Sequence, residues 1–242
     1  MKETTEWYSE RVQQQVKLVR WGHFGSPLLL FPTAGGDAEE AERFHLIGTL
    51  NGLLEAGRIK IYSLDSIAGR AWLGKKPAEY CAWLQDQFDA MIYHEIVPAI
   101  RADCQNPGIE IITAGASIGA FNAVASLCRH PDVFKFALGM SGTYNMGRFL
   151  QGPFTDALYF SSPLHYLPGL ANESPQLQAL RQRFVVLSFG QGRWEDPNES
   201  WQLADVLGSK GIPNRVDPWG PEWDHDWPTW RAMLPKYMEE LL

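Results

Sequence analysis

Hydrophobic positions along the chain follow two alternating periods. Short runs that are almost wholly apolar predict buried strands of a parallel sheet, at 28–31, 59–64, 109–113, 134–140, 184–190 and 214–219. Between these runs, apolar residues recur every three or four positions, which is typical of helices. The predicted helices lie at about 37–57, 77–102, 118–129, 199–208 and 230–241, and the first of them begins with Asp37 and Glu40 in capping-box spacing.

The alternation of strands and helices predicts an α/β fold. Strands joined by helices of ten or more residues form right-handed crossovers, so we expect a mostly parallel sheet with helices on both faces. The segment 11–21 has period two and is interpreted as a half-exposed antiparallel edge strand at the N-terminal side. The connection 141–182 is too long for a mere loop, and we expect short helices there, arranged like a lid over the carboxyl edge of the sheet.

Length and charge limit the class of protein. With 242 residues, of which 45% are hydrophobic, the chain is predicted to be a single domain, 1–242. The net charge of −7, without long runs of like charge, argues against nucleic acid or an anionic membrane as partner. The polar start and the lack of a long apolar run predict a soluble, cytoplasmic protein. Three separate cysteines suggest neither disulfides nor a zinc site, and a homo-oligomer is left open.

The stretch Gly115-Ala116-Ser117-Ile118-Gly119 carries the first candidate chemistry. A serine in a tight strand-to-helix turn brings the residues two before and two after it together, so both must be small. The turn would expose the Ser117 hydroxyl and direct the Ile118 N–H, at a helix N-terminus, toward a developing oxyanion. A plain structural turn between strand and helix is the alternative interpretation.

A base and an acid are expected after the last two strands. His225 follows the final predicted strand and precedes the final helix, whereas the other histidines fit packed or solvated positions. After the preceding strand, Glu195 and Asp196 compete for the acid. Asp196 is preferred, because Pro197 rigidifies the turn and a shorter side chain suits a fixed bond to the imidazole. Asp226 is explained as a helix N-cap, and no metal ion is expected beside His225.

The glycine-rich loop after the strand 28–31 offers a second oxyanion donor. By position the Ala34 N–H is the candidate, and Gly35 would let a substrate approach the backbone. The alternative is that the two glycines only turn the chain into the next helix. Trp194 and Trp223, next to the proposed acid and base, are candidates for the wall of an acyl pocket, whereas Trp230 fits a core position.

Four segments of the chain, which include the candidate site residues Ser117 and His225, resemble one branch of the α/β-hydrolase superfamily. "FPTAGGD", "ITAGASIGAFNAVASLCRHPDVF", "GMSGTYN" and "DHDWPTW" are similar to the esterase branch that includes esterase D (S-formylglutathione hydrolase), feruloyl and acetylxylan esterases and the antigen 85 mycolyltransferases. The resemblance implies the α/β-hydrolase fold and a Ser-Asp-His triad, with Pro32-Thr33 standing where many members have His-Gly.

The sequence therefore predicts a serine carboxylesterase without a cofactor, acting on a small-molecule ester through an acyl-enzyme intermediate. Its activity should rise with pH through roughly 6 to 7, where an ordinary imidazole loses its proton. An acyltransferase with the same triad and a non-catalytic binding module are the two alternatives.

Overall fold

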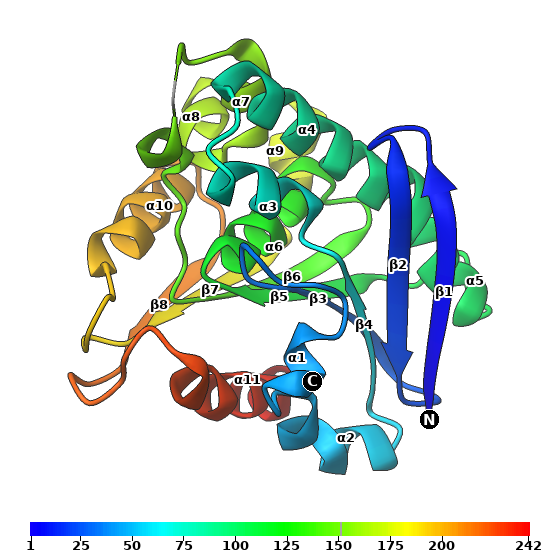
Figure 1. The fold of residues 1–242 in the computed structure, drawn as a ribbon. Helices are drawn as coiled ribbons and strands as arrows, with labels where there is room; N and C mark the ends of the chain where they lie inside the picture. Colours follow the sequence, from blue (N-terminus) through cyan, green and yellow to red (C-terminus); the bar gives the residue numbers. More distant parts are fainter. Residues whose placement is uncertain (151) are drawn as a thin grey trace.

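The computed structural model describes residues 1–150 and 152–242, and one eight-stranded sheet runs through them (Figure 1). The order of the strands is β1-β2-β4-β3-β5-β6-β7-β8. Neighbouring strands from β4 to β8 are parallel, whereas β1 and β2 are antiparallel to their neighbours. The predicted fold class, a mostly parallel sheet with an antiparallel N-terminal edge, is confirmed. The bounds are β1 Lys2–Ser9, β2 Gln14–Trp21, β3 Ser26–Phe31, β4 Ile59–Leu64, β5 Ile111–Ala116, β6 Phe134–Met140, β7 Phe184–Phe189 and β8 Asn214–Pro218.

The edge strand is not the one that the sequence indicated. The segment 11–21 contains β2, which pairs with β1 on one side and with β4 on the other. The edge on this side of the sheet is β1, which is polar and exposed along almost its whole length. A strand exposed on both faces has no alternating hydrophobic pattern, so periodicity could not reveal it.

Helices cover both faces of the sheet. α1 (Glu40–Arg43), α2 (Asn51–Glu55) and α11 (Trp227–Leu241) lie on one face, below the sheet in Figure 1. The other helices lie on the opposite face: α3 Ile67–Leu73, α4 Ala78–Met91, α5 Val97–Asp103, α6 Ile118–Arg129, α7 Asp156–Ser161, α8 Pro163–Tyr166, α9 Pro175–Leu180 and α10 Pro197–Ser209. Each face has its own hydrophobic core, and neighbouring strand residues alternate between them, as Leu28 and Leu29 do.

Two predicted helices are interrupted. The pattern from Asp37 to Gly57 forms only α1, the 3₁₀ helix η1 (Ile47–Leu50) and α2, because His45 takes a positive φ of 61° that ends the first helix. The capping box does not form, since no side chain caps α1 and the Glu40 carboxylate binds Thr33 instead. The long helix 77–102 is present as α4 and α5, joined by a π-helical turn, Ile92–Ile96.

The connection 141–182 contains the expected short helices. They are α7, α8 and α9 with the 3₁₀ helices η3 (Met146–Phe149) and η4 (Leu167–Gly169). α7 packs against α4, and α8 contacts α6 and α10. Among residues 1–150 and 152–242, no helix combines the length and the apolar character needed to cross a membrane.

Candidate active site

Ser117 lies in a sharp turn between β5 and α6. Its backbone is held at φ 58° and ψ −124°, a conformation that residues other than glycine rarely adopt. Its N–H donates to the Met140 carbonyl (3.0 Å), and its carbonyl accepts from the Thr143 N–H (3.2 Å). The hydroxyl does not cap the helix, and the residue is partly exposed. The turn thus presents the serine at the carboxyl end of the sheet, as the sequence predicts.

The two glycines of the motif are required by the close approach of backbone segments. A Cβ atom added to Gly115 would lie 2.3 Å from the carbonyl group of Gly119. A Cβ atom on Gly119 would lie 2.6 Å from the carbonyl oxygens of both Phe31 and Pro32. The steric reason for the G-x-S-x-G spacing is therefore confirmed, and the first turn of α6 lies directly against the end of β3.

His225 and Glu195 are brought together from different loops. His225 lies between β8 and α11, and its Nδ1 is 3.6 Å from Oε2 of Glu195 in the loop after β7. The Glu195 side chain is only 2% exposed. Its other oxygen, Oε1, accepts hydrogen bonds from the Ser141 hydroxyl (2.6 Å) and the Gly190 N–H (3.1 Å). A buried carboxylate thus faces one nitrogen of the imidazole.

Asp196, the acid preferred from the sequence, does not face His225. It occupies the N-cap position of α10, its side chain is 48% exposed, and its Oδ2 lies 3.9 Å from Nη1 of Arg148. Pro197 does fix the local backbone, but it does so by starting α10, and the Asp196 side chain is then directed outward. The geometry therefore favours Glu195, the alternative, over Asp196 as the candidate acid, and its role stays a prediction.

Several contacts join the loop after β7, which carries Glu195, to the loop after β8, which carries His225. The Gly192 N–H donates to the Trp223 carbonyl (2.9 Å), and the His225 N–H donates to the Arg193 carbonyl (3.0 Å). The Arg193 guanidinium binds the Asp224 carboxylate through Nε (2.9 Å) and Nη2 (2.6 Å). These hydrogen bonds from Arg193 lower the pKa of Asp224. A Cβ atom on Gly190 would meet the Trp223 oxygen at 1.9 Å, so the two loops can approach this closely only with glycine there.

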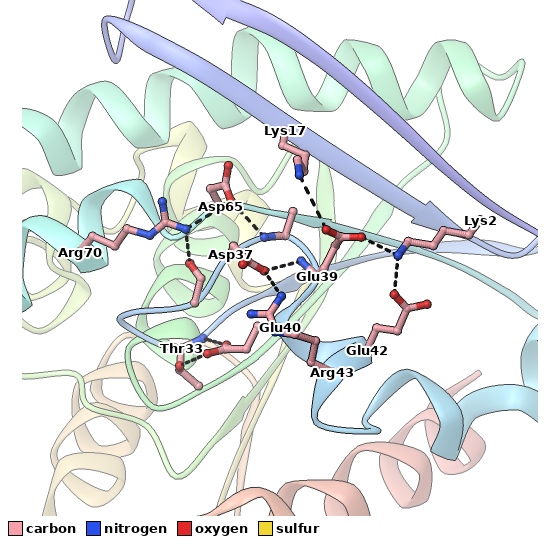
Figure 2. Close-up of polar contacts among 12 residues, drawn as sticks. Lys2, Lys17, Thr33, Asp37, Glu39, Glu40, Glu42, Arg43, Asp65 and Arg70 are labelled. Carbon is pink, nitrogen blue, oxygen red and sulfur yellow. Dashed lines mark hydrogen bonds and ion pairs between the residues drawn. The ribbon is translucent and has the colours of Figure 1, made fainter.

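The loop after β3 is held by charged side chains (Figure 2). The buried Glu40 accepts hydrogen bonds from the Thr33 N–H (2.8 Å) and the Thr33 hydroxyl (2.7 Å). On the other side, Arg70 of α3 donates to the Gly36 carbonyl (2.9 Å), and Asp65 accepts from the Ala38 N–H (3.1 Å). Both ends of the loop are therefore fixed.

Ala34 and Ile118, the predicted oxyanion donors, belong to segments that touch each other, because α6 packs on the end of β3. Gly69 of α3 packs closely against Ala34, because a Cβ atom at position 69 would lie 2.8 Å from the Ala34 oxygen. Within residues 1–150 and 152–242, neither the Ala34 N–H nor the Ile118 N–H has a protein acceptor. Their role as oxyanion donors stays a prediction.

The predicted substrate-binding residues have different surroundings. Trp194 has a positive φ of 64° and is 75% exposed, with the Arg193 guanidinium 5.2 Å from its ring centroid. Trp223 packs edge-on against Trp219, with 4.9 Å between centroids. Gly35 is exposed. Contact of these three positions with a substrate remains a prediction.

Two residues close to the site were not assigned from the sequence. Glu40 binds Thr33, although its spacing from Asp37 suggested a helix cap. Ser141 binds Glu195 and lies in "GMSGTYN", which contributed only to the resemblance. In the part of the chain that the structure describes, no group of three or more His, Cys, Asp or Glu residues is placed to hold a metal ion.

Solved structures with the same fold include several hydrolases. A ferulic acid esterase superimposes with a TM-score of 0.74 at 17% identity, over 98% of this chain and 95% of its own. An S-formylglutathione hydrolase from Agrobacterium tumefaciens gives a TM-score of 0.72 at 11% identity, over 99% and 94%. FphF, a fluorophosphonate-binding serine hydrolase of Staphylococcus aureus, gives 0.70 at 14% identity, over 99% and 97%. At these identities the likeness establishes the α/β-hydrolase fold.

The comparison with family models identifies the family. No curated protein matches the chain. The model described as "Putative esterase" matches residues 71–240, which include Ser117, Glu195 and His225. The suspected resemblance is thereby confirmed over most of the chain: the protein belongs to this esterase family and is a hydrolase acting on esters.

Proposed function

We propose that the protein is a serine carboxylesterase in which Ser117 is the nucleophile, His225 the general base and Glu195 the acid that orients the base. The observation that carries the proposal is the buried Glu195 carboxylate 3.6 Å from Nδ1 of His225. It is supported by the strained turn that presents Ser117 at the same edge of the sheet. Strained backbone at such a turn is typical of functional sites.

The position of Glu195 determines which nitrogen of His225 acts. A carboxylate beside Nδ1 favours the tautomer that carries its proton there, which leaves Nε2 free to accept a proton. In the first step Nε2 takes the Ser117 hydroxyl proton while Oγ forms a bond to the ester carbonyl carbon. The tetrahedral intermediate collapses, the alcohol leaves with the proton from His225, and the acyl group remains on Ser117.

Water completes the cycle. It attacks the acyl carbon, gives its proton to Nε2 of His225, and releases the acid as the proton returns to Ser117. In both steps the N–H groups of Ile118 and Ala34 stabilise the negative oxygen by hydrogen bonding. Both are available to donate, since neither has another acceptor among the described residues. Glu195 stabilises the imidazolium that forms in each step.

The substrate is proposed to be a small-molecule ester. Gly35 would let it approach the loop after β3, and Trp194 and Trp223 would contact it beside the acid and the base. The cytoplasmic location predicted from the sequence also stays a proposal.

Hydrolysis of p-nitrophenyl esters, from acetate to decanoate, tests the proposal. We expect wild type to hydrolyse at least one chain length and Ser117→Ala to lose roughly 10⁴-fold or more in kcat. A fluorophosphonate probe should label wild type at Ser117 and leave the variant unlabelled. Retained activity or retained labelling in Ser117→Ala would contradict the assignment of the nucleophile. Product analysis with an added alcohol separates the esterase from an acyltransferase, which would form a new ester.

A further inference from the structure

Ser141 follows β6 directly and has an unusual backbone. Its φ is 47°, although it is not a glycine, and the residue is only 3% exposed. Its N–H donates to the Ser188 carbonyl of β7 (2.7 Å), which anchors the residue to the sheet. A positive φ is unfavourable for a residue with a side chain, so a buried serine in this conformation calls for an explanation.

The Ser141 hydroxyl connects Glu195 to a tryptophan. It lies 2.6 Å from Oε1 of Glu195 and 3.0 Å from Nε1 of Trp230. An ionised carboxylate can only accept hydrogen bonds, and an indole N–H can only donate. The single hydroxyl proton must therefore point at Glu195, while the hydroxyl oxygen accepts from Trp230. The direction of this chain of hydrogen bonds is fixed throughout.

The same tryptophan also contacts the base. The rings of Trp230 and His225 meet edge to face, with 5.4 Å between centroids and 82° between planes. Trp230 is 4% exposed and is set in the core formed by α11. Its N–H thus fixes the hydroxyl that binds Glu195, and its ring limits the rotation of His225. Four side chains, Glu195, Ser141, Trp230 and His225, form a closed ring of contacts.

We propose that Ser141 and Trp230 are positioning residues of the esterase site, which hold the Glu195 carboxylate and the His225 imidazole in their productive orientation. The proposal rests on the function proposed above. The Ser141 hydroxyl is the charge-assisted donor to a carboxylate whose other donor is the Gly190 N–H. It stabilises the negative form of the Glu195–His225 pair, in which the imidazole is neutral and able to act.

Other charged groups around the pair have partners of their own. They are Arg193 with Asp224, Arg148 with Glu199, and Asp226, which caps α11; Asp196 lies near Arg148. Because these pairs do not involve the Ser141 hydroxyl, its removal changes the donors to Glu195 and leaves the paired charges as they are.

Ser141→Gly is the most direct test. Glycine accepts a φ of 47° without strain, so the variant removes the hydroxyl and keeps the backbone. We expect kcat for a p-nitrophenyl ester to fall roughly 10- to 100-fold, the effect of a hydrogen bond to a charged group, with KM almost unchanged. We also expect the acid limb of the pH–rate profile to move to higher pH, because the negative form of the pair has lost a donor.

Trp230→Phe sharpens the test. It removes the indole N–H and keeps a ring beside His225, so we expect a smaller loss of about 3- to 10-fold. Combined with Ser141→Gly it should add nothing, because the N–H has then lost its acceptor. Such non-additivity distinguishes a connected pair from two independent structural effects.

Ser63→Ala is the matched control. Ser63 is a buried serine in β4 whose hydroxyl has no partner among the described residues, and the variant should keep wild-type kcat. The proposal is overturned if Ser141→Gly keeps both kcat and the pH profile, or if its kcat falls equally at every pH in proportion to lost folded protein. Failure of the esterase proposal is a separate result, seen as activity that does not depend on Ser117.

Discussion

Glu195 and Asp103 are carboxylates at opposite ends of the sheet, and their hydrogen-bond donors differ in charge. Glu195, at the carboxyl end, accepts from the Ser141 hydroxyl and the Gly190 N–H, both neutral, and faces His225. Asp103 ends α5 beside the amino end of β4. It binds Arg20 (2.7 Å) and Lys60 (2.7 Å), and it accepts a hydrogen bond from the Tyr62 hydroxyl.

The difference in donors predicts different effects for the loss of the two carboxylates. Asp103 forms ion pairs with two cations, Arg20 and Lys60. The Lys60 side chain is only 6% exposed, so the Asp103 carboxylate stabilises a buried ammonium group. Glu195 has only neutral hydrogen-bond donors, the Ser141 hydroxyl and the Gly190 N–H, and no Arg or Lys side chain pairs with it among the described residues. Loss of Glu195 should therefore affect catalysis, and loss of Asp103 should affect stability.

The largest effect is expected for Glu195→Gln. The amide keeps the size of the side chain but loses the charge that stabilises the imidazolium and selects its tautomer, so kcat should fall about 10³- to 10⁴-fold. Steady-state hydrolysis of a p-nitrophenyl ester measures the loss, and thermal unfolding checks that the variant is folded. A loss under tenfold in a folded variant would show that Glu195 is not the acid.

Asp103→Asn should instead lower the free energy of unfolding. The variant leaves the buried Lys60 ammonium without its carboxylate. Loss of one partner from a fully buried pair costs about 3–5 kcal/mol, and we expect about 2 kcal/mol, because the Asp103 side chain is 32% exposed. Urea unfolding measures the change. The folded fraction should keep wild-type kcat, and a large fall in kcat would break the distinction between the two carboxylates.

The stabilisation by Asp103 should also depend on pH. Burial opposes ionisation of this carboxyl, but hydrogen bonds from Lys60 and Tyr62 and the charge of Arg20 outweigh it, so its pKa is lowered. A lowered pKa in the folded state gives stability that is complete above the unfolded value, about 3.9, and is lost as the pH falls through the folded value.

The stability difference between wild type and Asp103→Asn should therefore be constant between pH 5 and pH 7 and shrink below about pH 4. Urea unfolding at a series of pH values measures it. Asp132→Asn, at an exposed residue outside this cluster, serves as the control for general acid effects. A difference that persists undiminished down to pH 2 would show that the Asp103 charge is not what stabilises Lys60.

Much of the sheet and the position of Ser117 could be predicted, because their signals are local. β4, β6 and α6 have the predicted bounds, since an apolar run or a helical period within the segment decides them. Ser117 was found because the steric demand of its turn falls on Gly115 and Gly119, two residues away on either side.

What the sequence could not decide depends on distant contacts. Glu40 has capping-box spacing from Asp37, but its carboxylate binds Thr33 instead. The hydrophobic and polar pattern of the helix does not indicate this contact. The Ser141 hydroxyl contacts Glu195, 54 residues further along the chain, and Trp230, 89 residues further along. Three-dimensional packing alone brings these side chains together.

The smallest effect is expected for Asp196→Asn, and it tests the decision between neighbouring acids. Asp196 and Glu195 are adjacent, but α10 begins after Asp196, so one carboxylate points to solvent and the other into the protein. Because an exposed carboxylate 3.9 Å from Arg148 contributes little, kcat should change less than about twofold. The free energy of unfolding should change by less than about 0.5 kcal/mol. Both variants should be assayed under the same conditions. A 10³-fold loss of kcat in Asp196→Asn together with full activity in Glu195→Gln would show that Asp196, and not Glu195, is the acid.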